Sequence, residues 1–197
     1  QALAKGAKMG GAKIFENMCV CEIETKNSGT SGARQVSGVK VEVPSPGSGE
    51  ASELKTISAE IVVNCAGLWG HRVGKMAGVN VPLHAAEHFY IVTENIGLPS
   101  TLPVLRDPSS WIYAKEDAGK MLVGCFEPKS KPRPLNTIPE DFSFGQFEED
   151  WEHFEPAMLN AMHRIPKLED AGIHTFFNGP ESFTPDDRYI LGEAPEL

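Results

Sequence analysis

The sequence Ile61-Val62-Val63-Asn64-Cys65-Ala66-Gly67-Leu68-Trp69 decides the fold that we expect for this chain. Its β-branched start and small-residue end are typical of a buried strand in a sheet covered on both faces, followed by a helix. Another group can approach the backbone closely at Ala66-Gly67, since neither residue has a bulky side chain. In open α/β sheets, ligands collect beyond the carboxyl ends of strands. The stretch therefore predicts one wall of a cofactor pocket, and the alternative is a buried strand that simply turns into a helix.

Composition and charge limit the classes of function. Of the 197 residues, 41% are hydrophobic and 23% are charged, which is ordinary for a globular protein. The net charge of -9 argues against nucleic acid or an anionic membrane as partner, because both need a basic surface. No apolar run approaches the roughly 20 residues of a membrane helix. The cysteines lie in apolar strand contexts without framework spacing, which favours a reduced, intracellular compartment: Cys19, Cys21, Cys65 and Cys125.

The first part of the chain alternates in the manner of a meander of strands. Residues 1–10 are rich in helix formers and end at Gly10-Gly11. Since the sequence begins inside this helical pattern, we expect the chain to be a segment of a longer polypeptide. Gly/Ser-rich and Pro-rich loops separate the strands. The predicted strands cover residues 12–15, 18–25, 36–43, 54–58 and 61–65, and a helix covers 69–77.

A second layer begins where the sequence becomes strongly β-favouring at Phe89. Apolar residues at a spacing of three and four predict a helix over 146–165, which Pro156 would kink or restart. The acidic residues on its opposite face indicate a solvated surface rather than a binding site: Glu148, Glu149, Asp150 and Glu152. The predicted strands cover 89–93, 102–106, 111–115, 121–126, 173–178 and 189–191, with a turn at Gly179-Pro180. The predicted fold class is α+β.

One motif suggests zinc. His84-Ala85-Ala86-Glu87-His88 matches H-x-x-E-H, a zinc-protease signature that places its histidines on one face of a helix. Pro82 precedes this motif and the β-favouring run starts only after it, at Phe89, so we expect no helix here and no metal site. Neither a G-x-S-x-G elbow, a G-x-G-x-x-G segment nor a Walker loop occurs in the sequence, so acyl transfer and a self-contained nucleotide site have no support.

His88 and Tyr113 are candidate functional residues, because both fall in strands of the second layer beside aromatic neighbours. A core histidine and a packed tyrosine are the alternative. Arg106 lies one residue before a turn, where it could anchor a carboxylate or cap the end of a strand. Cys19 and Cys21 share one face of a strand, but no second cysteine or histidine pair supports metal binding there.

Six segments, in the same order along the chain, carry a resemblance to a known family. They are residues 63–69 (VNCAGLW), 79–83 (VNVPL), 87–94 (EHFYIVTE), 102–107 (LPVLRD), 178–186 (NGPESFTPD) and 191–197 (LGEAPEL). Together they resemble the sarcosine/dimethylglycine dehydrogenase branch of the D-amino-acid-oxidase-like flavoproteins. The resemblance implies a partial, Rossmann-like FAD-binding lobe over residues 1–78, an antiparallel substrate domain over 79–175, and a return to the FAD-binding domain over 176–197.

The resemblance also implies a role for individual residues. His88 and Tyr113 match the histidine and tyrosine that face the substrate over the flavin ring. The positions matched to FAD contacts are Val20, Cys65, Ala66, Gly67, Leu68, Trp69, Pro185 and Asp186. The Gly-rich phosphate loop of such enzymes has no counterpart in this sequence, so the isolated chain is expected to bind FAD weakly or not at all.

The implied chemistry is the oxidation of an N-methyl amino acid such as sarcosine or dimethylglycine, with hydride passing to the flavin. The implied location is the cytoplasm in a bacterium or the mitochondrial matrix in a eukaryote. Tetrahydrofolate is a further partner in relatives that carry a C-terminal folate domain. Residues 82–90 (PLHAAEHFY) and 149–156 (EDWEHFEP) are closer to pyruvate dehydrogenase phosphatase regulatory subunits, so a regulatory, non-catalytic relative remains the alternative.

Overall fold

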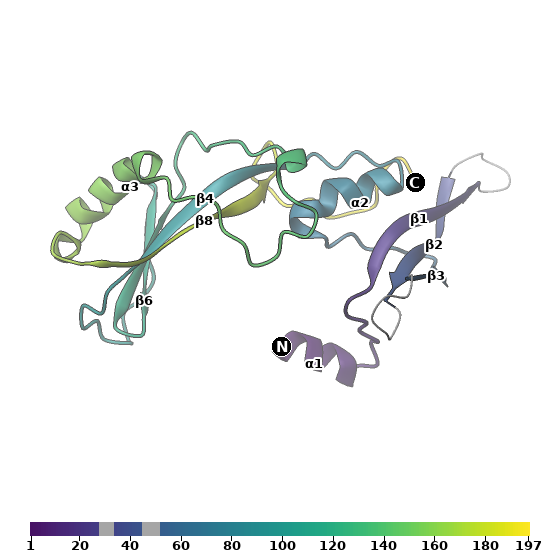
Figure 1. Cartoon of the computed structure of the whole chain (residues 1–197), viewed down its shortest axis with the longest axis horizontal. Helices are drawn as coiled ribbons and strands as arrows, with labels where there is room; N and C mark the ends of the chain where they lie inside the picture. Colours follow the sequence, from purple (N-terminus) through teal and green to yellow (C-terminus); the bar gives the residue numbers. More distant parts are fainter. Residues whose placement is uncertain (28–33, 45–51) are drawn as a thin grey trace. The chain divides into compact units, whose positions relative to one another are not determined.

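The computed structural model describes residues 1–27, 34–44 and 52–197 (Figure 1). The chain forms two compact units. The first contains residues 1–82 together with 189–197, and the second contains residues 83–188. From the sequence we placed the second boundary at residue 175, whereas the structure keeps the chain in the second unit up to Arg188.

The first unit is built around a small antiparallel sheet of β1 (Cys19–Asn27), β2 (Arg34–Val43) and β3 (Glu53–Ser58), in that order. All three strands confirm predicted ones. Gly38 allows β2 to approach β3, because a Cβ there would meet the carbonyl oxygen of Ile57 at 2.5 Å. The helix predicted at the start of the chain is also confirmed, as α1 (Ala2–Met9).

The predicted strand at residues 61–65 is wrong. These residues form no strand, and the side chains of Ile61 and Val63 are 80% and 76% exposed. A strand needs ladder partners, and none of the described strands pairs with this segment. The side chain of Asn64 makes hydrogen bonds here in place of a strand ladder. Its amide donates to the carbonyl of Gly70 at 2.8 Å, and its oxygen accepts from the backbone N–H of Ala66 at 3.2 Å.

The predicted helix after Trp69 is confirmed as the short 3-10 helix η1 (Gly67–Trp69) and α2 (Gly70–Met76). Gly74 lets α2 pack closely on the segment that follows, because a Cβ there would meet Val81 Cγ2 at 2.5 Å.

Two other predicted strands are wrong. Residues 12–15 and 189–191 are irregular, and their apolar side chains are exposed with no strand beside them among the described residues.

The second unit is built on a five-stranded antiparallel sheet whose order is β5-β6-β7-β4-β8. Its longest pair is β4 (His84–Thr93) and the edge strand β8 (Ile173–Phe183), which run side by side over their full length (Figure 1). The remaining strands are β5 (Leu105–Asp107), β6 (Ile112–Asp117) and β7 (Lys120–Cys125).

Strand β8 is longer than predicted. We expected a turn at Gly179-Pro180, yet the strand continues to Phe183, with Pro180 opposite Glu87 of β4. An edge strand tolerates proline, because the missing N–H can face away from the sheet. This extension matters for the candidate site described below, because it places residues 179–183 beside residues 84–88 of β4.

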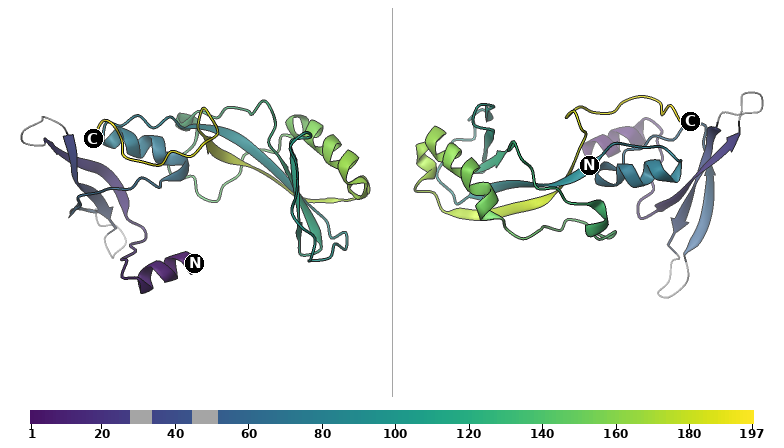
Figure 2. Two further views of the ribbon diagram at one scale, coloured as in Figure 1. Left: turned by 180° about the vertical axis from the view of Figure 1, so that it is seen from behind. Right: turned by 90° about the horizontal axis from the view of Figure 1, so that it is seen from above.

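Helix α3 (Trp151–Arg164) packs against one face of this sheet, as Figure 2 shows. The Asp150 carboxylate caps it by accepting from the N–H of His153 at 3.0 Å. Short 3-10 turns flank it, η2 (Leu135–Thr137) and η3 (Pro166–Leu168). The core between helix and sheet consists chiefly of Phe89, Ile91, Ile112, Ala114, Val123, Phe154, Ala157, Ala161, Leu168 and Phe176.

The helix runs through Pro156 without a restart, which excludes one of the two effects that we expected of this proline. Pro156 is exposed, so water can hydrate the helix carbonyl that its missing N–H leaves free.

No helix in the described part of the chain is both long enough and apolar enough to span a bilayer.

Phe154→Ala should lower the free energy of unfolding by about 3 to 5 kcal/mol, because Phe154 is fully buried and its loss leaves a cavity. Leu159→Ala on the exposed side of the same helix, 55% exposed, is the control and should change it by less than about 0.5 kcal/mol. Denaturant unfolding of both variants gives the comparison. Equal losses would contradict the packing of α3 described above.

Candidate functional site

The face of the five-stranded sheet opposite α3 carries the candidate site. Side chains alternate along a strand, so with Phe89 and Ile91 packed under α3, His88 and Tyr90 lie on the other face. Cross-strand pairing extends this second face over the whole sheet. We call it the aromatic face, and its residues are Tyr90, His88, Tyr113, Phe177, Phe183, Arg106 and Glu181, joined by Phe126 at the end of β7.

His88 is the centre of this face. Its side chain is 14% exposed, and its Nε2 lies 3.5 Å from the hydroxyl oxygen of Tyr113 and 3.7 Å from Oε2 of Glu181. The first distance is the long limit for a hydrogen bond, and such contacts commonly shorten when a ligand binds. The structure therefore brings together the two residues that we singled out in the sequence, and it adds a carboxylate to them.

Aromatic rings surround the pair. The Phe126 ring lies 5.1 Å from the His88 ring and 5.4 Å from the Tyr113 ring, and the Phe183 ring lies 6.4 Å from His88. Gly124 makes room for Tyr113, because a Cβ at Gly124 would meet the tyrosine ring at 2.2 Å. The side chain of Tyr113 thus lies across β7 and points toward His88.

Burial first, and the nearby Cys125 and Glu181 to a smaller extent, together raise the pKa of Tyr113 to about 12. A negative phenolate is disfavoured in this position, since the ring is desolvated and acidic groups face it. Tyr113 is accordingly a neutral hydrogen-bond donor at any physiological pH.

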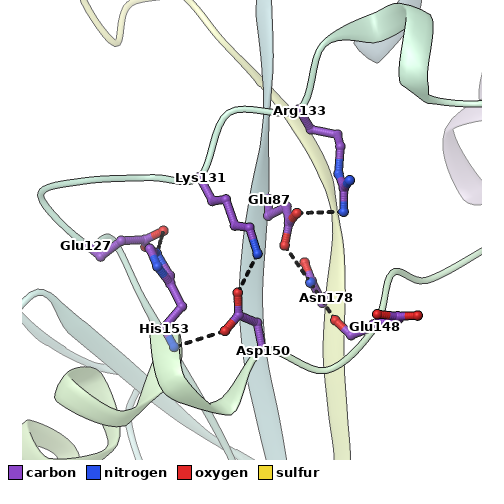
Figure 3. A network of polar contacts seen from close by, with 8 residues as sticks. All are labelled: Glu87, Glu127, Lys131, Arg133, Glu148, Asp150, His153 and Asn178. Carbon is purple, nitrogen blue, oxygen red and sulfur yellow. Dashed lines mark hydrogen bonds and ion pairs between the residues drawn. The ribbon is translucent and has the colours of Figure 1, made fainter.

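A buried polar network supports the site from the α3 side of the sheet (Figure 3). Glu87, next to His88, is 1% exposed, and its carboxylate pairs with Arg133 Nη2 at 2.7 Å and accepts from Asn178 Nδ2 at 2.8 Å. The same amide group of Asn178 donates to the carbonyl of Glu148 at 2.8 Å. A buried carboxylate needs such partners, because its desolvation is costly.

The network attaches the connection between β7 and α3 to strand β4. Backbone bonds join Glu87 N–H to Lys131 O at 2.9 Å and Arg133 N–H to Ala85 O at 2.8 Å. Lys131 also pairs with Asp150 at 2.7 Å, and this hydrogen bond lowers the pKa of Asp150 and raises that of Lys131 (Figure 3). These contacts fix the backbone on both sides of Glu87, and thereby the position of His88.

The zinc-like motif lies in β4, which confirms that it is not helical, although the strand begins five residues earlier than predicted. Glu87 and His88 point to opposite faces of the sheet. His84 and His88 share a face but stand about 13 Å apart along the strand, too far for a single ion. No group of three metal-ligating side chains occurs among the described residues.

The residues predicted to contact a cofactor are divided between the two units. Val20 lies in β1, and residues 65–69 form the exposed or half-buried turn made of Cys65, Ala66 and η1. Gly67 has a φ of 53°, and nothing lies within 4 Å of the position that a Cβ would take. Pro185 and Asp186 belong to the second unit, in a turn where Asp186 accepts from the N–H of Arg188 at 3.2 Å.

Our sequence analysis missed Glu181, Phe126 and the network of Glu87 with Asn178 and Arg133. Glu181 had a usable signal, because residues 173–183 continue a strand alternation that we ended at the Gly179-Pro180 pair. The buried pairing of Glu87 had none, since Arg133 and Asn178 lie 46 and 91 residues away and only the fold joins them.

Comparisons with known proteins show the family of this chain. The family described as "DAO: FAD dependent oxidoreductase" matches residues 1–197. Human sarcosine dehydrogenase, mitochondrial, is 39% identical over 99% of this chain and 20% of its own length. The 4-methylaminobutanoate oxidase (formaldehyde-forming) of Paenarthrobacter nicotinovorans is 36% identical over 100% of this chain and 22% of its own length. The chain spans about a fifth of the length of these curated relatives.

Two further proteins are relevant. The mitochondrial pyruvate dehydrogenase phosphatase regulatory subunit of Mus musculus is 34% identical over 98% of this chain and 20% of its own length. The crystal structure of L-proline dehydrogenase from P. horikoshii superposes with a TM-score of 0.72 at 21% identity, over 100% of this chain and 46% of that one. The latter match confirms the mixed α+β fold with antiparallel sheets.

Tyr113→Phe should remove a step near pH 12 from the rise of tyrosinate absorbance with pH, since Tyr113 is one of only three tyrosines and keeps its proton up to that range. Tyr189→Phe, which removes a tyrosine that is 88% exposed, is the control and should leave this step in place. If Tyr113→Phe instead loses absorbance that the wild type develops well below pH 12, and keeps the step near pH 12, then Tyr113 is not desolvated.

Glu87→Ala should lower the free energy of unfolding by about 3 to 5 kcal/mol, because it leaves Arg133 and Asn178 without their buried partner. Glu94→Ala removes a carboxylate that is 60% exposed beside His174, and should cost less than about 1 kcal/mol. Denaturant unfolding measures both losses. A Glu87→Ala protein as stable as the Glu94→Ala control would disprove the supporting role of the network.

Proposed function

Because the chain belongs to the DAO family of FAD-dependent oxidoreductases, we propose that the whole protein oxidises an N-methyl amino acid such as sarcosine or dimethylglycine. The observation that carries this proposal is the contact of His88 with Tyr113 on a sheet face lined by aromatic rings. The similarity to a sarcosine dehydrogenase and a 4-methylaminobutanoate oxidase supports it, because the names of both indicate substrates that carry an N-methyl group.

The residues present fit a part of an FAD site. The turn of residues 65–69 has two small side chains at Ala66 and Gly67, and the space at Gly67 is open. We assign these residues, with Val20, Pro185 and Asp186, to cofactor contact. When bound, FAD supplies the redox chemistry by accepting a hydride from the N-methyl carbon.

His88 would manage the proton on the substrate nitrogen. An amine can expel a hydride only while its nitrogen keeps a lone pair, so the ammonium form has to lose its proton first. Nε2 of His88 can accept this proton, and Oε2 of Glu181 at 3.7 Å can then stabilise the resulting imidazolium. Proton transfer by a positioned base contributes about 10²- to 10⁴-fold in rate.

Tyr113 would orient the substrate. As a neutral phenol it donates one hydrogen bond and does not add a negative charge next to the amine. The rings of Phe126 and Phe183 leave little water around His88, and electrostatic interactions are stronger where water is excluded. Transfer of the released carbon to tetrahydrofolate, as the resemblance implied, would require residues outside this chain.

A second candidate function is regulatory. The similarity to a pyruvate dehydrogenase phosphatase regulatory subunit, at 34% identity over 98% of the chain, is close to that of the oxidoreductases. In this reading the fold would bind a ligand or a partner without oxidising an amine. The two candidates differ in one measurable property, the turnover of an N-methyl amino acid.

His88→Gln in the whole protein should lower kcat for sarcosine or dimethylglycine by about a hundredfold or more, because the base is lost. His174→Gln is a matched control on β8, since His174 is 49% exposed and pairs with Glu94. It should keep wild-type activity. Release of formaldehyde and of the demethylated amine gives the rate.

Two results would contradict the proposal. A wild-type protein that contains FAD yet releases no formaldehyde from either amine would favour the regulatory candidate. If the wild type is active and the His88→Gln and His174→Gln variants have the same kcat, His88 takes no part in the reaction.

A further inference from the structure

The Phe126 ring contacts both candidate residues on the aromatic face. Its centroid lies 5.1 Å from the His88 ring and 5.4 Å from the Tyr113 ring, and Phe126 is itself 46% exposed. Phe126 directly follows β7, where its N–H donates to the carbonyl of Trp111 at 2.7 Å. This backbone bond does not set the direction of a half-exposed side chain, so the residues that flank Phe126 have to do so.

Cys125 and Glu127, which flank Phe126, point to the opposite side of the sheet. Cys125 is 2% exposed and belongs to the core under α3. The Glu127 side chain is 11% exposed, and its Oε2 accepts from the Cys125 thiol at 3.5 Å. Burial first, and then the charge of Glu127, raises the pKa of this thiol far above its usual value. The sulfur therefore keeps its proton and remains a donor to Glu127.

The other oxygen of Glu127 faces the first turn of α3. Its Oε1 lies 3.5 Å from Nε2 of His153, whose backbone N–H donates to Asp150 (Figure 3). The Phe89 ring lies 5.2 Å from the His153 ring. Oε1 of Glu127 and Nε2 of His153 are both buried, and neither has a hydrogen-bond partner in the part of the chain that the structure describes. Because buried polar atoms are costly without a partner, each of these groups depends on the other.

The Glu127–His153 pair connects the helix with the backbone on either side of Phe126. Phe154, the residue after His153, is fully buried and anchors this turn of α3 in the core. Glu127 is thus held from behind by the helix, and Cys125 is held by the core. With both neighbours directed behind the sheet, the side chain between them projects to the front, against His88.

We propose that Glu127 and His153 are positioning residues of the candidate site, whose contact behind the sheet holds the Phe126 ring against His88 and Tyr113. The ring then shields the His88 imidazole from water and keeps it directed to Tyr113. The effect on turnover rests on the proposed function, whereas the shielding of His88 is a property of the fold alone. Glu127 and His153 lie behind the sheet, so their loss acts on the reaction through Phe126.

A second glutamate–histidine pair provides a matched control. Glu94 and His174 lie 3.4 Å apart, but their side chains are 60% and 49% exposed. They lie at the end of the β4 and β8 ladder that is remote from His88. The same substitutions by glutamine therefore remove the same chemical groups at a place where no contact with Phe126 is involved.

Modification by diethyl pyrocarbonate, which reacts with accessible imidazoles, measures the shielding directly. The rate at His88 in the whole protein is followed by mass spectrometry of its peptide, with the exposed His163 as internal standard. Glu127→Gln and His153→Gln should each raise the rate about tenfold, as expected for the loss of one contact of a charged group. Glu94→Gln and His174→Gln should leave it unchanged.

The two positioning residues should act as one unit. In the double variant Glu127→Gln/His153→Gln, His88 should react no faster than in the single variants, because either substitution alone removes the whole contact. The value of kcat for sarcosine or dimethylglycine should follow the same pattern. Each single substitution should lower it about tenfold through the misplaced ring, and the double substitution no further.

The modification rate separates this inference from the proposed function. Faster reaction of His88 in both single variants of a protein that oxidises neither amine would support the positioning pair and reject the oxidoreductase. If Glu127→Gln does not fold, His153→Gln decides alone, since its side chain is 28% exposed and lies in the first turn of α3.

The inference is overturned if His88 in the His153→Gln protein reacts at the wild-type rate, or if Glu94→Gln and His174→Gln accelerate it equally. It is also overturned if the effects of the two single substitutions multiply in the double variant, because the residues would then act independently.

Discussion

The antiparallel pairing of β4 with β8 is the constraint on which the second unit depends. It runs from His84 opposite Phe183 to Thr93 opposite Ile173. Because side chains alternate, this single register sends Phe89 and Ile91 into the core under α3 and sends His88 and Tyr90 to the aromatic face. A slip of one residue would exchange the two sets, so the hydrophobic core and the candidate site are specified by the same ladder.

The buried Glu87 gives this register a second determinant. Its carboxylate is nearly inaccessible to water, and only the alignment of β4 with β8 brings Asn178 to it. A slipped register would leave the charge without its partners in an apolar environment, which is strongly unfavourable. The polar network on one face therefore fixes the residue that points to the other.

The sequence predicted most of the strands and the long helix, because these depend on local periodicity. His88 and Tyr113 were also identified in advance, and the structure brings them into contact. The failures have a common physical cause, the dependence of strands on partners. Residues 61–65 have the composition of a buried strand but lie exposed without one, whereas β8 continues through a proline because β4 pairs with it.

Pairing across long sequence separations was beyond prediction for the same reason. Glu181 reaches His88 only through the extension of β8, and Arg133 reaches Glu87 only through the loop that follows β7. No local pattern at Glu87 distinguishes a buried carboxylate from an exposed one. The resemblance to amine-oxidising flavoproteins indicated which residues to consider, and the fold showed how they could act together.

The central claim is that this face presents an N-methyl amine to a flavin, and the flavin spectrum of the whole protein tests it most directly. The spectrum would be recorded without oxygen, before and after the addition of sarcosine or dimethylglycine. The account predicts that the visible absorbance of the oxidised flavin bleaches with one of these amines. A bound flavin that stays oxidised with both would contradict it.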